Sequence, residues 1–264
     1  MAGVRIIVVP EPETLGARGA DIVVGTLERA VEQRRVAHVA LTGGSTAGHL
    51  YNALARGDFR SAVWTNVHLW WGDDRFVGFA DADSNVRLVR ETLLADGTAV
   101  GADPAHVHPF PIDLAFAAGE TAEWCAKRYA DELAAVVPIG PAGAPVFDLV
   151  LLGVGADGHL LSCFPGSPLI DAPAPPICAA TPPPTTALPA LPRVTCSPRI
   201  VDAARTVLVV VAGSSKAAVV QEILGAGAVP ERRPAAIAVR NGATWLIDAA
   251  AAALLGDDVQ LATS

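Results

Sequence analysis

The sequence of 264 residues is poor in charge, in aromatic side chains and in cysteine, and it has no long apolar run. Charged residues make up only 17% of it and hydrophobic residues 52%, the reverse of the balance in intrinsically disordered chains. No uninterrupted apolar stretch approaches the roughly 18 residues that a membrane-spanning helix needs. These features predict a folded globular protein that has no membrane span.

Cysteine is scarce, and its spacing excludes the common paired motifs. Cys125, Cys163, Cys178 and Cys196 form no C-x-x-C pair, and a chain of this length can bury a large core without disulfides. The apolar run at Ile6–Val9 is too short for the core of a signal peptide, and no small-residue cleavage pattern follows it. We therefore expect a cytoplasmic protein with reduced and mostly buried thiols.

Positive charge is also in short supply, because 19 lysines and arginines stand against 27 acids, a formal net charge of -8. Phosphate backbones demand a basic surface, so we expect no nucleic-acid partner. An anionic ligand would have to meet a local cluster of cations.

Apolar runs of strand length alternate along the chain with stretches of helical period, which is typical of parallel β-α units. Because the runs are continuous, we expect strands buried on both faces, with helices on both sides of the sheet. The predicted strands are Ile6–Val9, Val36–Thr42, Val67–Trp71, Val146–Gly153, Val207–Ala212 and Ala235–Val239. The predicted helices are Leu15–Val31, Asn85–Leu94, Ala122–Val136, Ala217–Leu224 and Asp248–Leu255.

Proline is concentrated in residues 171–192, where a helix cannot persist, so this stretch is predicted to be a long loop. The segments after it are again buried strands and helices of the same kind. We therefore expect one domain over residues 1–264, crossed by this loop, rather than two domains joined by a linker.

Paired glycines stand where the second predicted strand gives way to a helix. Gly43 and Gly44 would let backbone N–H groups approach an anion, and Ser45 and Thr46 add hydroxyl donors. A tight turn in which Ser45 caps the helix accounts for the same residues, so both interpretations stay open. No Lys-Ser/Thr pair follows, so this is not the P-loop.

The third predicted strand ends in Trp70-Trp71-Gly72-Asp73-Asp74-Arg75. Open α/β sheets bind ligands at the carboxyl ends of their strands, which makes Arg75 a candidate for binding a phosphate. The alternative is an exposed salt bridge from Arg75 to Asp73 or Asp74.

A glycine-rich turn after the fourth predicted strand contains Asp157 and His159. Its glycines match G-x-G-x-x-G, but the strand with a terminal acid about 20 residues on, which dinucleotide binding requires, is missing. A carboxylate beside an imidazole suits acid–base chemistry, since histidine's ordinary pKa of about 6.5 lets it accept a proton near neutral pH. A purely structural loop histidine is the alternative.

Lys216 falls in the first turn of the helix predicted after Ala212. A cation there opposes the helix dipole, so a bound anion facing it would explain its position, although a solvated surface lysine is the alternative.

The remaining polar patterns are weaker. His106 and His108 alternate as on one strand face, but nothing nearby adds a third ligand, so we expect no metal site. His38, His49 and His68 are interpreted as structural. A serine-hydrolase elbow is absent, because Ala47 stands where the last glycine of G-x-S-x-G would be.

Taken in this order, the motifs resemble the 6-phosphogluconolactonase family, within the sugar-phosphate isomerase and deaminase fold group. The most specific match is FDLVLLGVGADGHLLSCFPG at residues 147–166. The supporting stretches are LTGGST at 41–46, WWGDDRFV at 70–77, Ser84-Asn85, Arg193-Val194-Thr195, Gly213 with Lys216, and TWLIDAAAAALL at 244–255. The family's usual lysine is missing from the proline-rich stretch before Arg193, which is longer here.

The resemblance implies a three-layer α/β/α fold with a mostly parallel, Rossmann-like sheet. It also implies hydrolysis of 6-phospho-D-glucono-1,5-lactone to 6-phosphogluconate, in the oxidative pentose phosphate pathway, without a metal or an organic cofactor. His159 would be the general base that activates water, and Asp157 would orient His159 or the water. The substrate and its phosphate would be bound by Gly43, Gly44, Ser45, Thr46, Asp73, Arg75, Lys216 and Arg193.

Three other functions stay open. A glucosamine-6-phosphate deaminase of the same fold group is expected to have a glutamate five residues after the histidine, where this sequence has Phe164. A sugar-phosphate sensor would keep the anion site without turnover, and a nicotinamide dehydrogenase would bind NAD(P). Both a monomer and a small homo-oligomer are compatible with the sequence.

Overall fold

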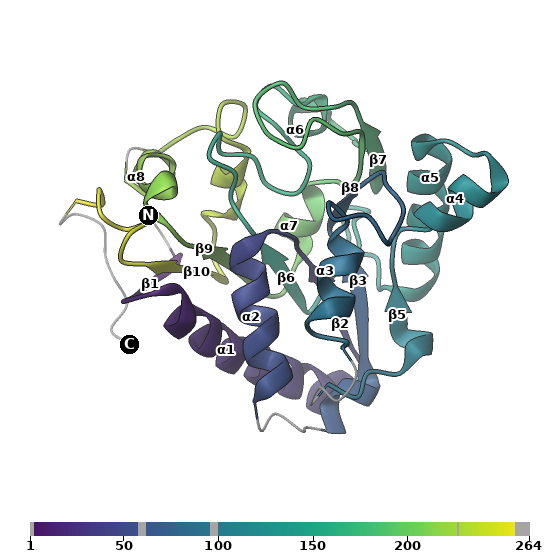
Figure 1. The fold of residues 1–264 in the computed structure, drawn as a ribbon, viewed down its shortest axis with the longest axis horizontal. Helices are drawn as coiled ribbons and strands as arrows, with labels where there is room; N and C mark the ends of the chain where they lie inside the picture. Colours follow the sequence, from purple (N-terminus) through teal and green to yellow (C-terminus); the bar gives the residue numbers. More distant parts are fainter. Residues whose placement is uncertain (1–2, 58–61, 96–99, 226, 257–264) are drawn as a thin grey trace.

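The structure is a computed structural model that describes residues 3–57, 62–95, 100–225 and 227–256. Its centre is a seven-stranded parallel sheet (Figure 1). The strands in spatial order are β1 (Arg5–Val9), β10 (Ala243–Asp248), β9 (Val207–Val211), β6 (Leu149–Leu152), β2 (Ala37–Leu41), β3 (Val67–Trp71) and β5 (Val107–His108). A second, antiparallel sheet joins β4 (Asp73–Arg75), β8 (Arg193–Cys196) and β7 (Cys178–Thr181).

The helices flank the central sheet (Figure 1). They are α1 (Pro12–Arg34), α2 (Ser45–Arg56), α3 (Asn85–Glu91), α4 (Ile112–Ala118), α5 (Ala122–Val136), α6 (Pro168–Asp171), α7 (Arg199–Ala203) and α8 (Ala217–Leu224). Short 3-10 helices are η1 (Ala62–Asn66), η2 (Pro104–His106), η3 (Ser214–Lys216) and η4 (Pro234–Ala238). Among the described residues, no helix combines the length and the apolar character that crossing a bilayer would require.

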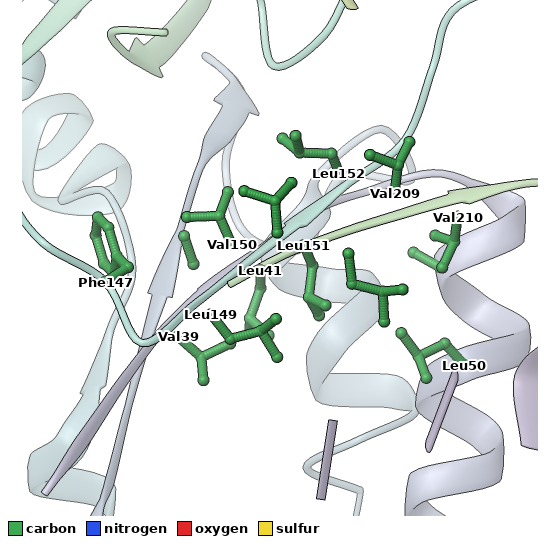
Figure 2. Close-up of a cluster of buried hydrophobic side chains, with 14 of the residues drawn as sticks. Val39, Leu41, Leu50, Phe147, Leu149, Val150, Leu151, Leu152, Val209 and Val210 are labelled. Carbon is green, nitrogen blue, oxygen red and sulfur yellow. The ribbon is translucent and has the colours of Figure 1, made fainter. Parts of the chain in front are cut away.

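Side chains of the central strands pack on both faces of the sheet, as their continuous apolar runs predict. Every residue of β2, β6 and β9 is buried. Figure 2 shows Val150 and Leu152 on one side of the strands, and Leu149 on the other side together with Val39 and Leu50 of α2. The helices α1 and α2 therefore cover the face to which Leu149 points.

The opposite face is covered by α5. Ala40 pairs with both Val150 and Trp70, so these three side chains share a face of the sheet. Tyr129 of α5 meets Trp70 edge-on, with the ring centroids 5.8 Å apart, and its hydroxyl hydrogen-bonds to the backbone of Trp71. The predicted three-layer α/β/α architecture is confirmed.

The chain leaves β2 in two directions, and this creates a switch point in the sheet. It runs outward through β3 and β5 on one side, and then through β6, β9 and β10 on the other. In open α/β sheets, ligands bind outside the carboxyl ends of the strands at such a point. The junction of β2 with β6 is therefore where the fold predicts a binding site.

Two of the predicted elements near the carboxyl terminus are wrong. Ala235–Val239 is not a strand, because Pro234 begins the 3-10 helix η4 there, and the last strand is β10, after the turn at Gly242. Asp248–Leu255 is not a helix. Asp248 ends β10, and its carboxylate accepts the N–H groups of Gly213 and Ala251, so residues 249–254 form turns.

Other differences concern boundaries. The helix predicted over Asn85–Leu94 stops at Glu91, because Thr92 leaves the helical conformation with φ -120 and ψ -82. The proline-rich stretch is not loop throughout, since Cys178–Thr181 forms β7 against β8. The predicted burial of the cysteines is confirmed, and Cys125, Cys163, Cys178 and Cys196 are free thiols.

Candidate active site at the carboxyl edge of the sheet

The four motifs found in the sequence follow four neighbouring strands. They come after β9, β6, β2 and β3, which lie side by side in that order. A cavity of about 220 Å³ opens at this edge. Of the residues predicted to form the site, it is lined by Gly43, Gly44, Ser45, Thr46, Asp73, Arg75, His159, Arg193 and Lys216. Asp157 does not line it but contacts His159.

The amino terminus of α2 faces this cavity without a side-chain cap. Gly44, with φ 91, is the N-cap residue, and none of the described side chains caps the helix there. Ser45 is the first helical residue, so the interpretation of Ser45 as the cap is wrong. A Cβ on Gly43 would lie 1.8 Å from Asn85 Oδ1, so only glycine fits there. The open N–H groups and the helix dipole make this end a suitable anion site.

The guanidinium of Arg75 is held by a backbone carbonyl rather than by an acid. Its Nη1 donates to the carbonyl of Asp83 at 2.5 Å, while its backbone N–H donates to Asp74 Oδ1 at 2.8 Å. Within the described residues no side-chain ion pair joins Arg75 to Asp73 or Asp74, and its buried Nε has no hydrogen-bond partner. The salt-bridge alternative for Arg75 is therefore not supported.

Arg193 is almost fully buried, and it reaches the cavity from β8. Its Nη2 donates to the carbonyl of Pro189 at 3.1 Å, and its guanidinium lies 5.3 Å from the ring centroid of Phe164. Burial lowers the pKa of Arg193, and the charge of Asp73 opposes that shift. Its Nε, like that of Arg75, has no partner among the described residues. Unpaired buried donors on two cations favour an anionic ligand.

His159 and Asp157 form a short hydrogen-bonded pair at this edge. His159 Nδ1 lies 2.5 Å from Asp157 Oδ1, and the two side chains are only 20% and 12% exposed. Burial alone would raise the pKa of Asp157, but the hydrogen bond and charge of His159 and a hydrogen bond from Thr186 lower it to about 2. The pair approaches so closely to Gly155 that a Cβ there would lie 2.0 Å from His159 Nδ1.

Lys216 stands beside this pair, where it ends η3 and is the N-cap residue of α8. Burial lowers its pKa, and the charge of Asp157 opposes that shift. A half-buried lysine that lines the cavity and feels the charge of Asp157 is not a solvated surface residue. It adds a third cation to Arg75 and Arg193.

Three residues at or behind the cavity wall were not predicted as site residues. Asn85 lines the cavity and donates to the carbonyl of Asp73 at 2.9 Å, and the Ser84-Asn85 pair was the only signal for it. Ser162 donates to Asp73 Oδ2 at 2.6 Å and fixes that carboxylate at the cavity wall. Leu188 of the proline-rich stretch also lines the cavity while 88% exposed, and no local pattern indicated it.

Of the remaining histidines, His49 lies on α2, and the other four gather around β3 and β5. His108 Nε2 lies 2.9 Å from His68 Nδ1, and His106 stacks on His68 with 3.9 Å between ring centroids. His108 also pairs with Glu132 at 2.7 Å. Burial, together with the neighbouring imidazoles, lowers the pKa of His68 to about 4. Within the described chain, no group of three or more His, Cys, Asp or Glu is arranged to hold a metal ion.

Comparison with known proteins places this chain in a family. The family model described as glucosamine-6-phosphate isomerases/6-phosphogluconolactonase matches residues 10–247. A 6-phosphogluconolactonase of Streptomyces coelicolor is 36% identical over 260 residues, which cover 95% of this chain and 94% of that protein.

Solved structures agree with this assignment. The structure of 6-phosphogluconolactonase from Trypanosoma brucei has a TM-score of 0.81 at 31% identity, covering 96% of this chain and 98% of that one. A monomeric glucosamine-6-phosphate deaminase at 19% identity and a TM-score of 0.76 shares the fold. Because the family model spans most of the sequence and relatives above 30% identity match it almost from end to end, the chain belongs to the family of glucosamine-6-phosphate isomerases and 6-phosphogluconolactonases.

Proposed function

We propose that this protein hydrolyses 6-phospho-D-glucono-1,5-lactone to 6-phospho-D-gluconate. The observation that carries the proposal is the pairing of Asp157 with His159, which lines a cavity that three cations and an open helix end also line. The substrate has the two features that such a cavity accommodates, a phosphate dianion and an electrophilic lactone carbonyl. Relatives named 6-phosphogluconolactonase support the same reaction.

The contact with Asp157 determines which nitrogen of His159 acts. An ionised carboxylate only accepts hydrogen bonds, so Nδ1 of His159 carries the proton that bonds to Asp157 Oδ1. Nε2 then keeps its lone pair and can accept a proton from water. We take Asp157 to orient the base rather than the water, because its Oδ1 bonds to His159 and it does not line the cavity where water would attack.

The reaction needs two proton transfers. Water attacks the lactone carbonyl carbon while Nε2 of His159 takes its proton, and a tetrahedral intermediate forms. The bond from that carbon to the ring oxygen then breaks, and His159 returns the proton to the departing oxygen. The carbonyl carbon becomes a carboxylic acid, and the base is restored without a covalent intermediate.

The phosphate would be bound by the cations and the helix end. Arg75, Arg193 and Lys216 supply positive charge, and the N–H groups at Ser45 and Thr46 supply donors. This local cluster offsets the overall charge of -8 that would otherwise repel an anion. We propose the chain as one domain, since residues before and after the proline-rich stretch line the same cavity. The cytoplasmic location stays a prediction.

The deaminase is the weaker candidate. Phe164 stands five residues after His159, where that chemistry is expected to place an acid, and its ring lies 4.6 Å from the imidazole. An apolar ring at this distance can neither donate nor accept the proton that ring opening and isomerisation require.

The test is the loss of freshly made lactone, generated in situ and measured against its spontaneous hydrolysis. Wild-type protein should accelerate the loss, and His159→Ala should lower kcat by about 10²- to 10⁴-fold, the usual contribution of a positioned general base. His49→Ala is the matched control, since His49 lies on α2 but does not line the cavity. Turnover of glucosamine 6-phosphate without lactone hydrolysis would favour the deaminase. Binding without turnover would indicate a sensor, and binding of NAD(P) a dehydrogenase.

A further inference from the structure

The carboxylate of Asp157 is held from two separate parts of the chain. Oδ1 accepts hydrogen bonds from the ring and the backbone N–H of His159, at 2.5 and 3.2 Å. Oδ2 accepts one from the hydroxyl of Thr186, at 2.5 Å. Thr186 belongs to the proline-rich stretch, 29 residues further along the chain. Both oxygens of the carboxylate are therefore bonded, Oδ1 to His159 and Oδ2 to this stretch.

The stretch that carries Thr186 is itself fastened to the site. Leu188 lines the cavity, and the carbonyl of Pro189 accepts the hydrogen bond from Arg193. On the other side of the turn, Arg233 donates from Nη1 to the backbone carbonyl of Asp157 at 3.2 Å and pairs with Glu222 of α8 at 2.8 Å. Arg233 thus holds the backbone of the turn. Among the described residues, Thr186 is the one whose side chain bonds to Oδ2 of Asp157.

A hydrogen bond to the opposite oxygen matters because the plane of a carboxylate is otherwise loosely defined. Rotation about the terminal torsion of an aspartate is broad, and both hydrogen bonds from His159 meet the same oxygen, so they alone would leave the plane free to turn about Oδ1. A donor on the opposite oxygen restricts that rotation and keeps Oδ1 directed at Nδ1. A base that must remain oriented through two proton transfers depends on this restriction.

We propose that Thr186 is a positioning residue for the hydrolysis: its hydroxyl fixes the plane of Asp157 and thereby the orientation of His159. The inference rests on the proposed function of His159 and Asp157. It gives the proline-rich stretch a role in turnover, exercised through Asp157 rather than by contact with the substrate.

The test compares three substitutions in the same stretch, using the full chain and the lactone. Thr186→Val keeps the shape and removes the donor, and it should lower kcat about 3- to 10-fold with KM changed less than about twofold. Thr186→Ser keeps the donor and should restore kcat to within about twofold of wild type. Thr185→Val is the matched control, since the exposed side chain of Thr185 makes no hydrogen bond within the described chain, and it should change neither constant.

A double-mutant cycle separates positioning from a general loss of structure. In an Asp157→Ala background, Thr186→Val should have no further effect on kcat, because the carboxylate that it orients is gone. The same loss of kcat with and without Asp157, or a change confined to KM, would overturn the proposal. Full activity in His159→Ala would instead refute the proposed function. If His159→Ala is inactive while Thr186→Val keeps the wild-type kcat, the positioning role of Thr186 alone is refuted.

Discussion

At the scale of single residues, the site depends on charged groups that the protein leaves partly unpaired. Arg75 and Arg193 each keep a buried Nε without a partner among the described residues, and each reaches the cavity with the rest of its guanidinium anchored to a backbone carbonyl. A rigidly held guanidinium offers a fork of N–H donors that matches a phosphate. The arginines are therefore expected to act in binding, whereas His159 acts in the chemical step.

Replacing Arg75 separates these two roles. Arg75→Ala should raise KM about 10- to 100-fold, since a charge-assisted hydrogen bond contributes about 1.5–3 kcal/mol, while kcat changes by less than about threefold. Arg75→Lys should recover only part of the affinity, because an ammonium cannot form the fork. Steady-state kinetics on the lactone measures KM and kcat for both variants. Arg87→Ala on α3 is the control, and an unchanged KM in Arg75→Ala would remove Arg75 from the phosphate site.

The low pKa of Asp157 predicts how its contribution to stability varies with pH. The pKa is about 2 in the folded protein and 3.8 when unperturbed, so the unfolded chain binds the proton more readily. The stabilisation is therefore fully present above pH 3.8 and is lost as the pH falls through about 2. Unfolding of wild type and Asp157→Asn should be compared between pH 6 and pH 2. If the difference in the free energy of unfolding between the two proteins stays constant over this range, the prediction is contradicted.

At the scale of elements, one carboxylate joins the end of β4 to the start of α3. Asp74 accepts the backbone N–H groups of Arg75, Asn85 and Val86, at 2.8, 2.7 and 3.2 Å. Burial raises the pKa of Asp74 to about 7 against the effect of these bonds. Asn85 in turn lies so close to Gly43 that the start of α2 and the start of α3 approach within contact of each other.

That close approach makes Gly43 sensitive to a single added methyl group. Gly43→Ala places a Cβ 1.8 Å from Asn85 Oδ1, so the turn or α3 must shift. We expect a loss of about 1–3 kcal/mol in the free energy of unfolding, as for other overpacked positions, with a raised KM because the anion site is displaced. Gly48→Ala on α2 is the control. Its nearest neighbour, Leu88 Cδ1, is 3.8 Å away, and alanine favours the helix.

At the scale of the whole molecule, the end of the sheet opposite the cavity is fastened by one buried acid. Asp148 immediately precedes β6, accepts the N–H of His38 in β2 at 2.9 Å, and pairs with Arg34 at 2.7 Å and Arg205 at 3.3 Å. It therefore ties the start of β6 to β2, to the end of α1 and to the segment before β9. These are the strands whose opposite ends carry most of the site.

Removing this acid should affect stability and leave the chemistry intact. Asp148→Ala is expected to lower the free energy of unfolding by about 1.5–3 kcal/mol, the usual loss for hydrogen bonds to a charged group. The loss should be no larger, because the two arginine partners of Asp148 can be solvated instead. Urea unfolding measures the change, and kcat should stay at the wild-type value. Asp131→Ala, which removes an exposed pair with Lys127, should change the stability by less than about 0.5 kcal/mol. A large kcat effect in Asp148→Ala would show that this end is coupled to the site.

The sequence by itself determined the features that depend on residues close together along the chain. The continuous apolar runs at Ala37–Leu41 and Val207–Val211 required strands buried on both faces, and the glycines with polar residues after them identified where the strands end. Asp157 and His159 lie two residues apart in one turn, so their contact followed from the motif. The predicted strand and helix within residues 234–255 are wrong, because alanine-rich runs suit a helix, a strand or a turn equally well.

Only the tertiary structure decided what depends on strand order and on contacts between distant segments. Four motifs meet at one cavity because the strands before them, β9, β6, β2 and β3, are neighbours. The last strand, β10, forms because it fits between β1 and β9. Thr186 reaches Asp157, and Ser162 reaches Asp73, across 29 and 89 residues. Neither contact leaves a periodic signal in the sequence, because periodicity reports the conformation of neighbouring residues, whereas these contacts exist only after the chain has closed around the sheet.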